Sequence, residues 1–145
     1  MSKYRRLPSA TAALLWAGTM GLGIPLAAQT TDEPKPYIVW PKDTATVTNP
    51  VTVIFGLRDF GVAPAGIAKP GTGHHHLLID VAEPPPFGQP IPKDNQHRHF
   101  GGGQTQVTLE LPPGEHTLQL MLGDHNHIAQ DPSMLSEKIT INVVK

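Results

Sequence analysis

The sequence of 145 residues contains no cysteine, and this absence removes several classes of protein. Without thiols the chain has no disulfide scaffold, no cysteine-ligated zinc site or iron–sulfur cluster, no thiol nucleophile and no blue-copper centre. A strong charge of one sign is also missing. The formal net charge is -1, so we expect no nucleic acid as a partner. The length suits one ordinary domain.

Histidine, in contrast, is abundant. Eight histidines stand beside eleven lysines and arginines. Imidazole is the commonest metal ligand in proteins, and it titrates near neutral pH. The composition therefore favours metal binding through imidazole nitrogens rather than through sulfur.

The N-terminal segment, residues 1–28, has the pattern of a secretory signal peptide. Three basic residues are followed by a mostly small and apolar run, and Ala27 and Ala28 offer a cleavage site. Glycines and a proline interrupt this run, which is also short for the alternative, a transmembrane anchor. We therefore expect a periplasmic or secreted protein with no membrane span after cleavage. Residues 29–36 then form a flexible lead-in, and residues 37–145 form the folded domain.

Short runs typical of β-strands follow one another along this domain, separated by glycine, proline and asparagine. They are residues 37–40, 51–57, 75–81, 105–111, 116–122 and 138–144. Several alternate apolar and polar residues, which predicts one buried and one solvated face in an antiparallel sheet. Residues 112–114 (Pro-Pro-Gly) favour a hairpin turn, and residues 84–92, with five prolines, an irregular surface loop. We predict an all-β fold, a single antiparallel β-sandwich of the immunoglobulin-like or cupredoxin-like type.

Six of the eight histidines form three His-x-His pairs. The pairs are His74 with His76, His97 with His99, and His125 with His127. In an extended segment, residues two apart project to the same side, so each pair can present two imidazoles to one point. Two pairs would supply four nitrogens, a ligand set that suits copper, zinc or nickel, of which copper binds most tightly at a given site. Which pairs converge stays open at this point.

Three further residues accompany these pairs. Asp124 is a candidate oxygen ligand, or a partner that orients a ligand imidazole. His75 should point away from its two neighbours, to the side of Leu77 and Ile79, and support the site without binding the ion. His116 stands alone at the start of a strand, and we assign it no function.

Three segments of the chain, residues 72–80, 96–105 and 113–127, contain these histidines in a specific order. Together they resemble the exported bacterial family catalogued as domain of unknown function 4399, over about residues 40–145. The resemblance implies a small, exported, β-rich domain with histidine-containing loops. It implies no established activity.

These observations predict an exported, histidine-rich metal-binding protein that buffers or delivers an ion, copper first and zinc or nickel as alternatives. The competing hypothesis is a binding or structural module of the cell envelope, tied to glycan or to a partner protein there, whose histidines form a polar network that holds the loops. The residues favour a binding protein over an enzyme. Ser133 and Ser136 lack the setting of a serine nucleophile. The enzymatic alternatives are a superoxide-dismutase-like site, although the usual disulfide and motif order are missing, and a hydrolytic zinc site with Asp124 or Asp80 as base.

Overall fold

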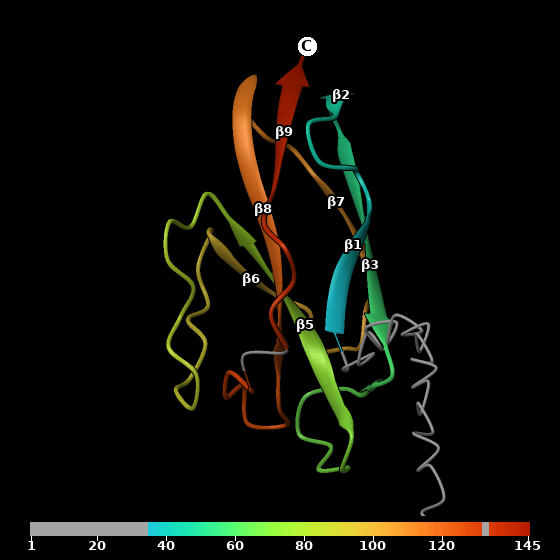
Figure 1. The fold of residues 1–145 in the computed structure, drawn as a ribbon, viewed down its shortest axis with the longest axis vertical. Coiled ribbons are helices and arrows are strands. Elements are labelled where there is room, and N and C mark those ends of the chain that lie inside the picture. The colour runs from blue at the N-terminus through green and yellow to red at the C-terminus, as the bar shows by residue number, and fades with distance from the viewer. Residues whose placement is uncertain (1–34, 132–133) are drawn as a thin grey trace, which may run out of the picture. The chain divides into compact units, whose positions relative to one another are not determined.

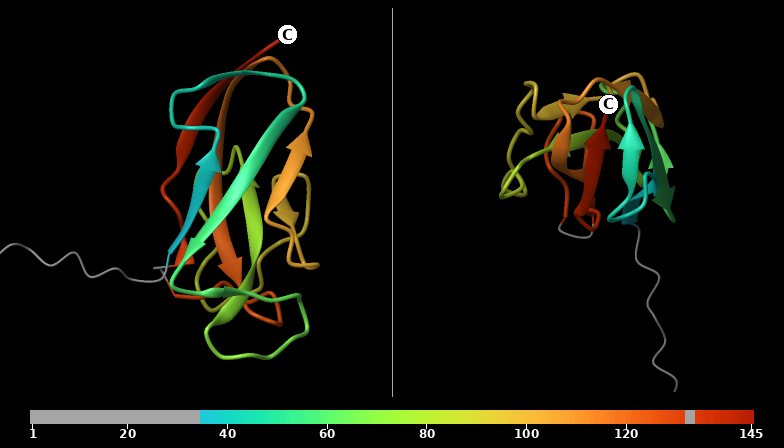
Figure 2. Two further views of the ribbon diagram at one scale, coloured as in Figure 1. Left: turned by 90° about the vertical axis from the view of Figure 1, so that its right-hand side faces the viewer. Right: turned by 90° about the horizontal axis from the view of Figure 1, so that it is seen from above.

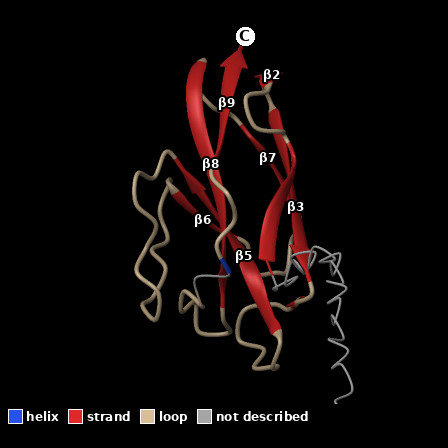
Figure 3. Ribbon diagram, in the orientation of Figure 1, coloured by secondary structure: helices blue, strands red, loops and turns tan. Residues whose placement is uncertain are grey.

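The computed structural model describes residues 35–131 and 134–145, all within one compact unit. The signal peptide expected at residues 1–28, and all but the end of the lead-in expected at residues 29–36, lie outside the described residues. The described residues are strands and loops, with one short helical turn at Met134 (Figure 3). Among them, no helix has the length and apolar character that crossing a bilayer requires.

Nine strands make up the described part of the chain. They are β1 (Lys35–Trp40), β2 (Thr46–Thr48), β3 (Val51–Arg58), β4 (Gly61–Val62), β5 (Thr72–Ile79), β6 (His97–His99), β7 (Gln106–Leu109), β8 (Gly114–Gly123) and β9 (Ile139–Val144). The six runs predicted from the sequence correspond to β1, β3, β5, β7, β8 and β9. The very short β2, β4 and β6 were not predicted, because two or three residues show no periodicity.

The strands form two sheets, which confirms the predicted all-β sandwich (Figure 1). The smaller sheet has the order β1-β3-β7 and is antiparallel. The larger sheet has the order β2-β9-β8-β5-β4, and β6 pairs with β5. The left view of Figure 2 looks onto β1, β3 and β7, with β5 and β8 behind them. The central pairs of the larger sheet are antiparallel, whereas β2 and β4 join it as short parallel strands.

The main hydrophobic core lies between the two sheets. Val53 and Phe55 of β3 belong to the same buried cluster as Leu77 of β5 and Leu118 and Leu120 of β8. These residues occupy alternate positions of their strands, as the period of two predicts. The face of β5 that carries Leu77 is therefore packed against the core between the two sheets.

The opposite face of the larger sheet is also buried, which the sequence did not predict. Met121 of β8 and Leu78 of β5 form a second cluster with Ile91 and Ala129, two loop residues. The loop between β5 and β6 lies on the side of the larger sheet that faces away from β1 and β3 (Figure 1). The predicted solvated face is therefore wrong for β5 and β8, because distant loops cover it and strand periodicity contains no information about them.

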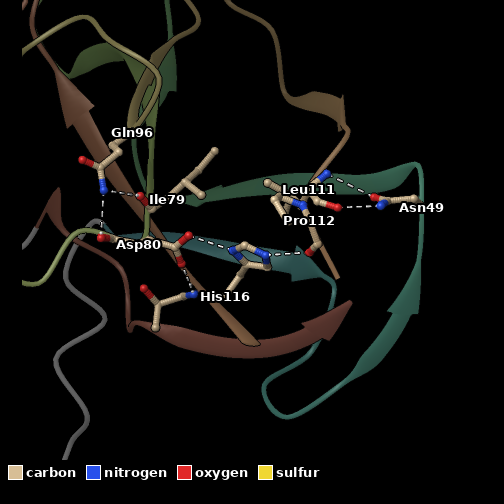
Figure 4. A network of polar contacts seen from close by, with 8 residues as sticks. Asn49, Ile79, Asp80, Gln96, Leu111, Pro112 and His116 are labelled. Carbon is tan, nitrogen blue, oxygen red and sulfur yellow. Dashed lines mark hydrogen bonds and ion pairs between the residues drawn. The ribbon is translucent and has the colours of Figure 1, made fainter. Parts of the chain in front are cut away.

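The hairpin predicted at residues 112–114 is also wrong. β7 pairs with β3, whereas β8 pairs with β5 and β9, so this segment crosses from one sheet to the other. Asn49 holds the crossing, because its Nδ2 donates to the carbonyl oxygen of Leu111 at 2.6 Å and its Oδ1 accepts from the Leu111 N–H at 3.2 Å (Figure 4). Alternation identifies a strand but not its partner, and both choices of partner give the same pattern.

Candidate metal centre

Three consecutive histidines of β5 divide between the two faces of the larger sheet. His75 faces the core, where its ring centroid lies 5.3 Å from that of Phe55. His74 and His76 face the opposite side, with ring centroids 4.8 Å apart. All three are buried, with at most 1% of their surface exposed. The strand pattern predicted this division correctly.

β6 brings a fourth histidine to His74 and His76. The antiparallel register places His99 directly opposite His76. The ring of His99 lies 5.0 Å from that of His74 and 5.1 Å from that of His76, between centroids. Gly101 leaves the space that this ring needs, because a Cβ there would lie 2.3 Å from Cε1 of His99.

His127 reaches the same place from the loop after β8. The carboxylate of Asp124 shapes this loop, because its Oδ1 accepts hydrogen bonds from the N–H groups of Asn126 and Ile128, both at 2.8 Å. The N–H of Ile91 donates to the carbonyl oxygen of His127 at 2.9 Å. Thus the proline-rich loop, predicted only as an irregular surface segment, helps to hold His127 in place.

One ring nitrogen from each of His74, His99 and His127 lies within 4.8 Å of the other two. Nε2 of His99 and Nε2 of His127 are 3.0 Å apart. Two nitrogens bound to one ion at about 2.0–2.1 Å lie about 2.9 Å apart at a right angle and about 3.3 Å apart at a tetrahedral angle. The observed separation falls in this interval, so these two imidazoles need little movement to share an ion.

His74 offers a further reason to consider an ion. Across residues 35–131 and 134–145, neither of its ring nitrogens has a hydrogen-bond partner, although the side chain is fully buried. A buried polar atom without a partner costs about 1–3 kcal/mol. An ion bound by this imidazole would satisfy one of the two nitrogens and offset that cost.

The chain matches the family described as domain of unknown function 4399 (DUF4399) over residues 53–144. It belongs to DUF4399. The match covers all eight histidines of the chain and both sheets of the sandwich, except β1, β2 and the first two residues of β3. No curated protein and no solved structure matches the chain.

The buried histidines of this DUF4399 domain are held in the neutral form. Burial, followed by the nearness of His99 and His127, lowers the pKa of His74 to about 4, although the Asp124 carboxylate opposes the shift. Burial and the charges of His74, His99 and His127 lower the pKa of His76 to about 3. Burial, His127 and Lys93 lower the pKa of His99. Because only a neutral imidazole has a free lone pair, His74, His76 and His99 are ready to bind an ion at neutral pH.

Two of the six candidate ligands lie apart from this cluster. His97 is opposite Leu78, two positions along β6 from His99, and its Nδ1 lies 2.9 Å from Oδ1 of Asp94. His125 has its Nε2 3.0 Å from Nδ2 of Asn126. His125 lines a pocket of about 360 Å³ that contains none of His74, His76, His99 and His127. The loop 124–127 is a turn rather than an extended segment, so His125 and His127 do not share a side.

The two expected supporting residues have different positions. Asp124 shapes the turn that carries His127, as described above. His75 makes no ring contact with His74 or His76, because it lies on the other face of the sheet and packs against Phe55. Burial lowers the pKa of His75, while backbone groups of Gln104 and Gly56 oppose the shift. Its role is therefore in the core of the DUF4399 sandwich.

His116, to which the sequence assigned no function, links three segments of the fold (Figure 4). Its Nδ1 lies 2.7 Å from Oδ2 of Asp80, and its Nε2 lies 2.8 Å from the carbonyl oxygen of Pro112. Because both oxygens are acceptors, a doubly protonated imidazolium satisfies both contacts. Partial burial opposes this charge, but the hydrogen bonds to Asp80 and Pro112 outweigh it and raise the pKa of His116.

Several residues of the site escaped sequence analysis. Gly123 provides room for His76, since a Cβ there would lie 2.7 Å from Cε1 of that ring. Lys93, Ile91 and Asn126 border the cluster from two different loops. The glycines that begin at Gly101, two residues after His99, were a visible signal of close packing. The loop residues had no such signal, because their position depends on how the loops fold over the sheet.

Proposed function

We propose that this DUF4399 protein is an exported metal-binding protein that holds a single ion through His74, His99 and His127, with His76 beside them. The observation that carries the proposal is the convergence of one ring nitrogen from each of these three histidines, of which the buried His74 has no hydrogen-bond partner for its ring among the described residues. Export rests on the signal-peptide pattern of residues 1–28 and is part of the proposal.

Copper is the ion that we propose first. The convergent ligands are all imidazole nitrogens, which suit copper, zinc and nickel, and copper binds such a site most tightly. His99 and His127 are only half-buried, so an ion can reach and leave the site without unfolding of the core. This accessibility supports buffering or delivery of copper rather than a permanently enclosed structural ion.

The alternative function, an envelope module whose histidines hold the loops, has one observation in its favour. His97 and His116 do bind carboxylates of Asp94 and Asp80 in this way. This network does not account for His74, because hydrogen bonding within the described residues leaves both of its ring nitrogens unpaired. We therefore assign loop holding to His97 and His116 and metal binding to the cluster.

The test uses untagged protein isolated from cells that express the full chain. Isothermal titration with copper(II), zinc(II) and nickel(II), together with elemental analysis, should give one ion per chain with copper tightest. His99→Gln and His127→Gln should each weaken copper binding by at least about tenfold, since each removes one of three ligands.

His97→Gln and His125→Gln are matched controls, because each changes the partner histidine of the same pair without touching the cluster. Both should bind copper like the wild type. The absence of stoichiometric copper, zinc and nickel would overturn the proposal. Equal losses in the controls and in the cluster variants would show that the ion binds elsewhere.

A further inference from the structure

A pocket of about 350 Å³ opens beside the histidine cluster. The side chains that line it come from the cluster and from the two covering loops: His76, His99, His127, Pro90, Ile91, Lys93 and Asn126. His74 does not line this pocket and is fully buried. The pocket therefore meets the cluster on its accessible side, with His74 on the buried side.

Three convergent histidines leave one coordination position of the ion for a ligand from this pocket. Copper, zinc and nickel ions bind four or more ligand atoms, and an ion held by three protein ligands takes its fourth ligand from solvent or substrate. His76 is the one cluster histidine outside the convergent group. Its ring centroid lies 6.2 Å from that of His127, whereas the rings of His74, His99 and His127 lie 4.6–5.0 Å from one another.

The charge in the pocket indicates what kind of ligand fits. Lys93 borders the pocket and is near enough to His99 for its charge to favour the neutral imidazole. An ammonium group at this place repels a metal cation, so it contributes nothing to holding the ion itself. It attracts an anion that approaches the ion from the pocket.

The geometry points to a three-histidine centre with an open position that takes a small anion from the pocket of Lys93. The anion donates a lone pair to the ion bound by His74, His99 and His127, while the Lys93 ammonium attracts its negative charge. His76 forms one wall of this position. The pocket has room for an anion of several atoms, since one water in the liquid occupies about 30 Å³.

This inference depends on the proposed function, and its test separates the two. The full-chain protein is first loaded with copper(II), and binding is measured. Sodium azide is then added in steps at constant ionic strength, and the electron paramagnetic resonance and charge-transfer absorption of the copper are recorded. Azide is expected to change both spectra with a saturating dependence.

Lys93→Gln should weaken azide binding by about two- to fivefold, which is the effect of one exposed charge. It should not weaken copper binding, because it removes a positive charge near a cation. Lys42→Gln, a change of the same charge in the exposed turn after β1, is the matched control and should bind azide like the wild type. Equal azide affinity in all three proteins would overturn the role of Lys93.

The open position itself would be overturned if copper binds but its spectra stay unchanged at all azide concentrations. This result would indicate a closed centre, and the proposed function would stand without this inference. If azide then binds only in the copper-loaded His76→Gln variant, His76 is the fourth ligand. Failure of copper to bind would instead overturn both proposals.

Discussion

Nε2 of His99 lies 3.0 Å from Nε2 of His127, although 28 residues separate the two histidines. Without an ion, one of these nitrogens donates a hydrogen and the other accepts it. An ion bound by both Nε2 atoms would take both lone pairs, and each ring would then carry its hydrogen on Nδ1. β6 places His99, and the turn of Asp124 places His127. Two separate elements, β6 and the turn that contains Asp124, therefore bring these two rings together.

Gly101 is the first position where this arrangement can be tested. Gly101→Ala places a Cβ 2.3 Å from Cε1 and 2.5 Å from Nε2 of His99, so the ring must leave its present position beside His127. We expect copper affinity to fall by about 10- to 100-fold, the usual effect of disturbing a residue that supports a metal ligand. Isothermal titration measures this loss.

The neighbouring glycine provides the control for that change. A Cβ at Gly102 meets only the end of the flexible Gln104 side chain, at 2.9 Å. Gly102→Ala should therefore bind copper nearly as tightly as the wild type. Equal affinities for all three proteins would mean that the position of the His99 ring is unimportant for binding.

Metal binding should also stabilise the fold. A ligand that binds only the folded chain adds about 2.7 kcal/mol at a concentration 100 times its dissociation constant, which corresponds to about 10 °C for a domain of this size. We expect copper to raise Tm by this amount in a thermal unfolding scan, and a chelator to reverse the rise. His99→Gln, with copper affinity at least about tenfold lower, should show at most about half of this rise at the same copper concentration, and a variant that keeps the full rise would exclude His99 as a ligand.

The metal-free protein should lose stability in acid. Above pH 6.5 His74 is neutral in both the folded and the unfolded chain, so it contributes no pH dependence. Below pH 6.5 the unfolded chain binds a proton that the folded chain binds only near pH 4, since burial lowers the pKa of His74 to that value. The free energy of unfolding should therefore fall by up to about 1.4 kcal/mol per pH unit for this residue.

Urea unfolding in the presence of chelator at several pH values between 7.5 and 4.5 measures this slope. His74→Gln removes the titrating group, so its slope should be shallower, whatever its stability at pH 7.5. A slope unchanged in His74→Gln would contradict the prediction.

The contact between His116 and Asp80 should have the opposite pH dependence. Hydrogen bonds to Asp80 and Pro112 raise the pKa of His116 despite its partial burial. The stabilisation that the charged His116 gives the fold is fully present below pH 6.5, and it is lost as the pH rises through the raised pKa of His116 in the folded chain. We expect Asp80→Asn to cost on the order of 1 kcal/mol at pH 6, allowing for solvent screening at the exposed Asp80, and less at pH 9.

Asparagine suits this test because it tolerates the positive φ of 55° at position 80 and keeps an oxygen for the Thr117 N–H. The measurement is the difference in the free energy of unfolding between the wild type and Asp80→Asn at the two pH values. A difference that does not shrink at pH 9 would mean that His116 is not charged in the folded protein.

Much of the fold could be predicted because its signals are local. The alternation in residues 51–57 and 138–144 identified β3 and β9, and the order of residues around His75 placed its ring in the core. The hairpin at residues 112–114 could not be judged in this way. Whether β8 pairs with β7 or with β5 depends on contacts between distant segments, for which a single strand pattern contains no signal.

The sequence by itself determined a cysteine-free β-sandwich with His74 and His76 on one face of a strand, because residue type and alternation are local properties. It also limited the candidate metal ligands to imidazole nitrogens and carboxylate oxygens, since the chain has no thiol. Only the tertiary structure decided which members of the other two pairs join His74 and His76. The register of β6 against β5 places His99 opposite His76, and the hydrogen bonds of Asp124 turn His127, rather than His125, toward the cluster. Both choices depend on backbone pairing across long sequence separations.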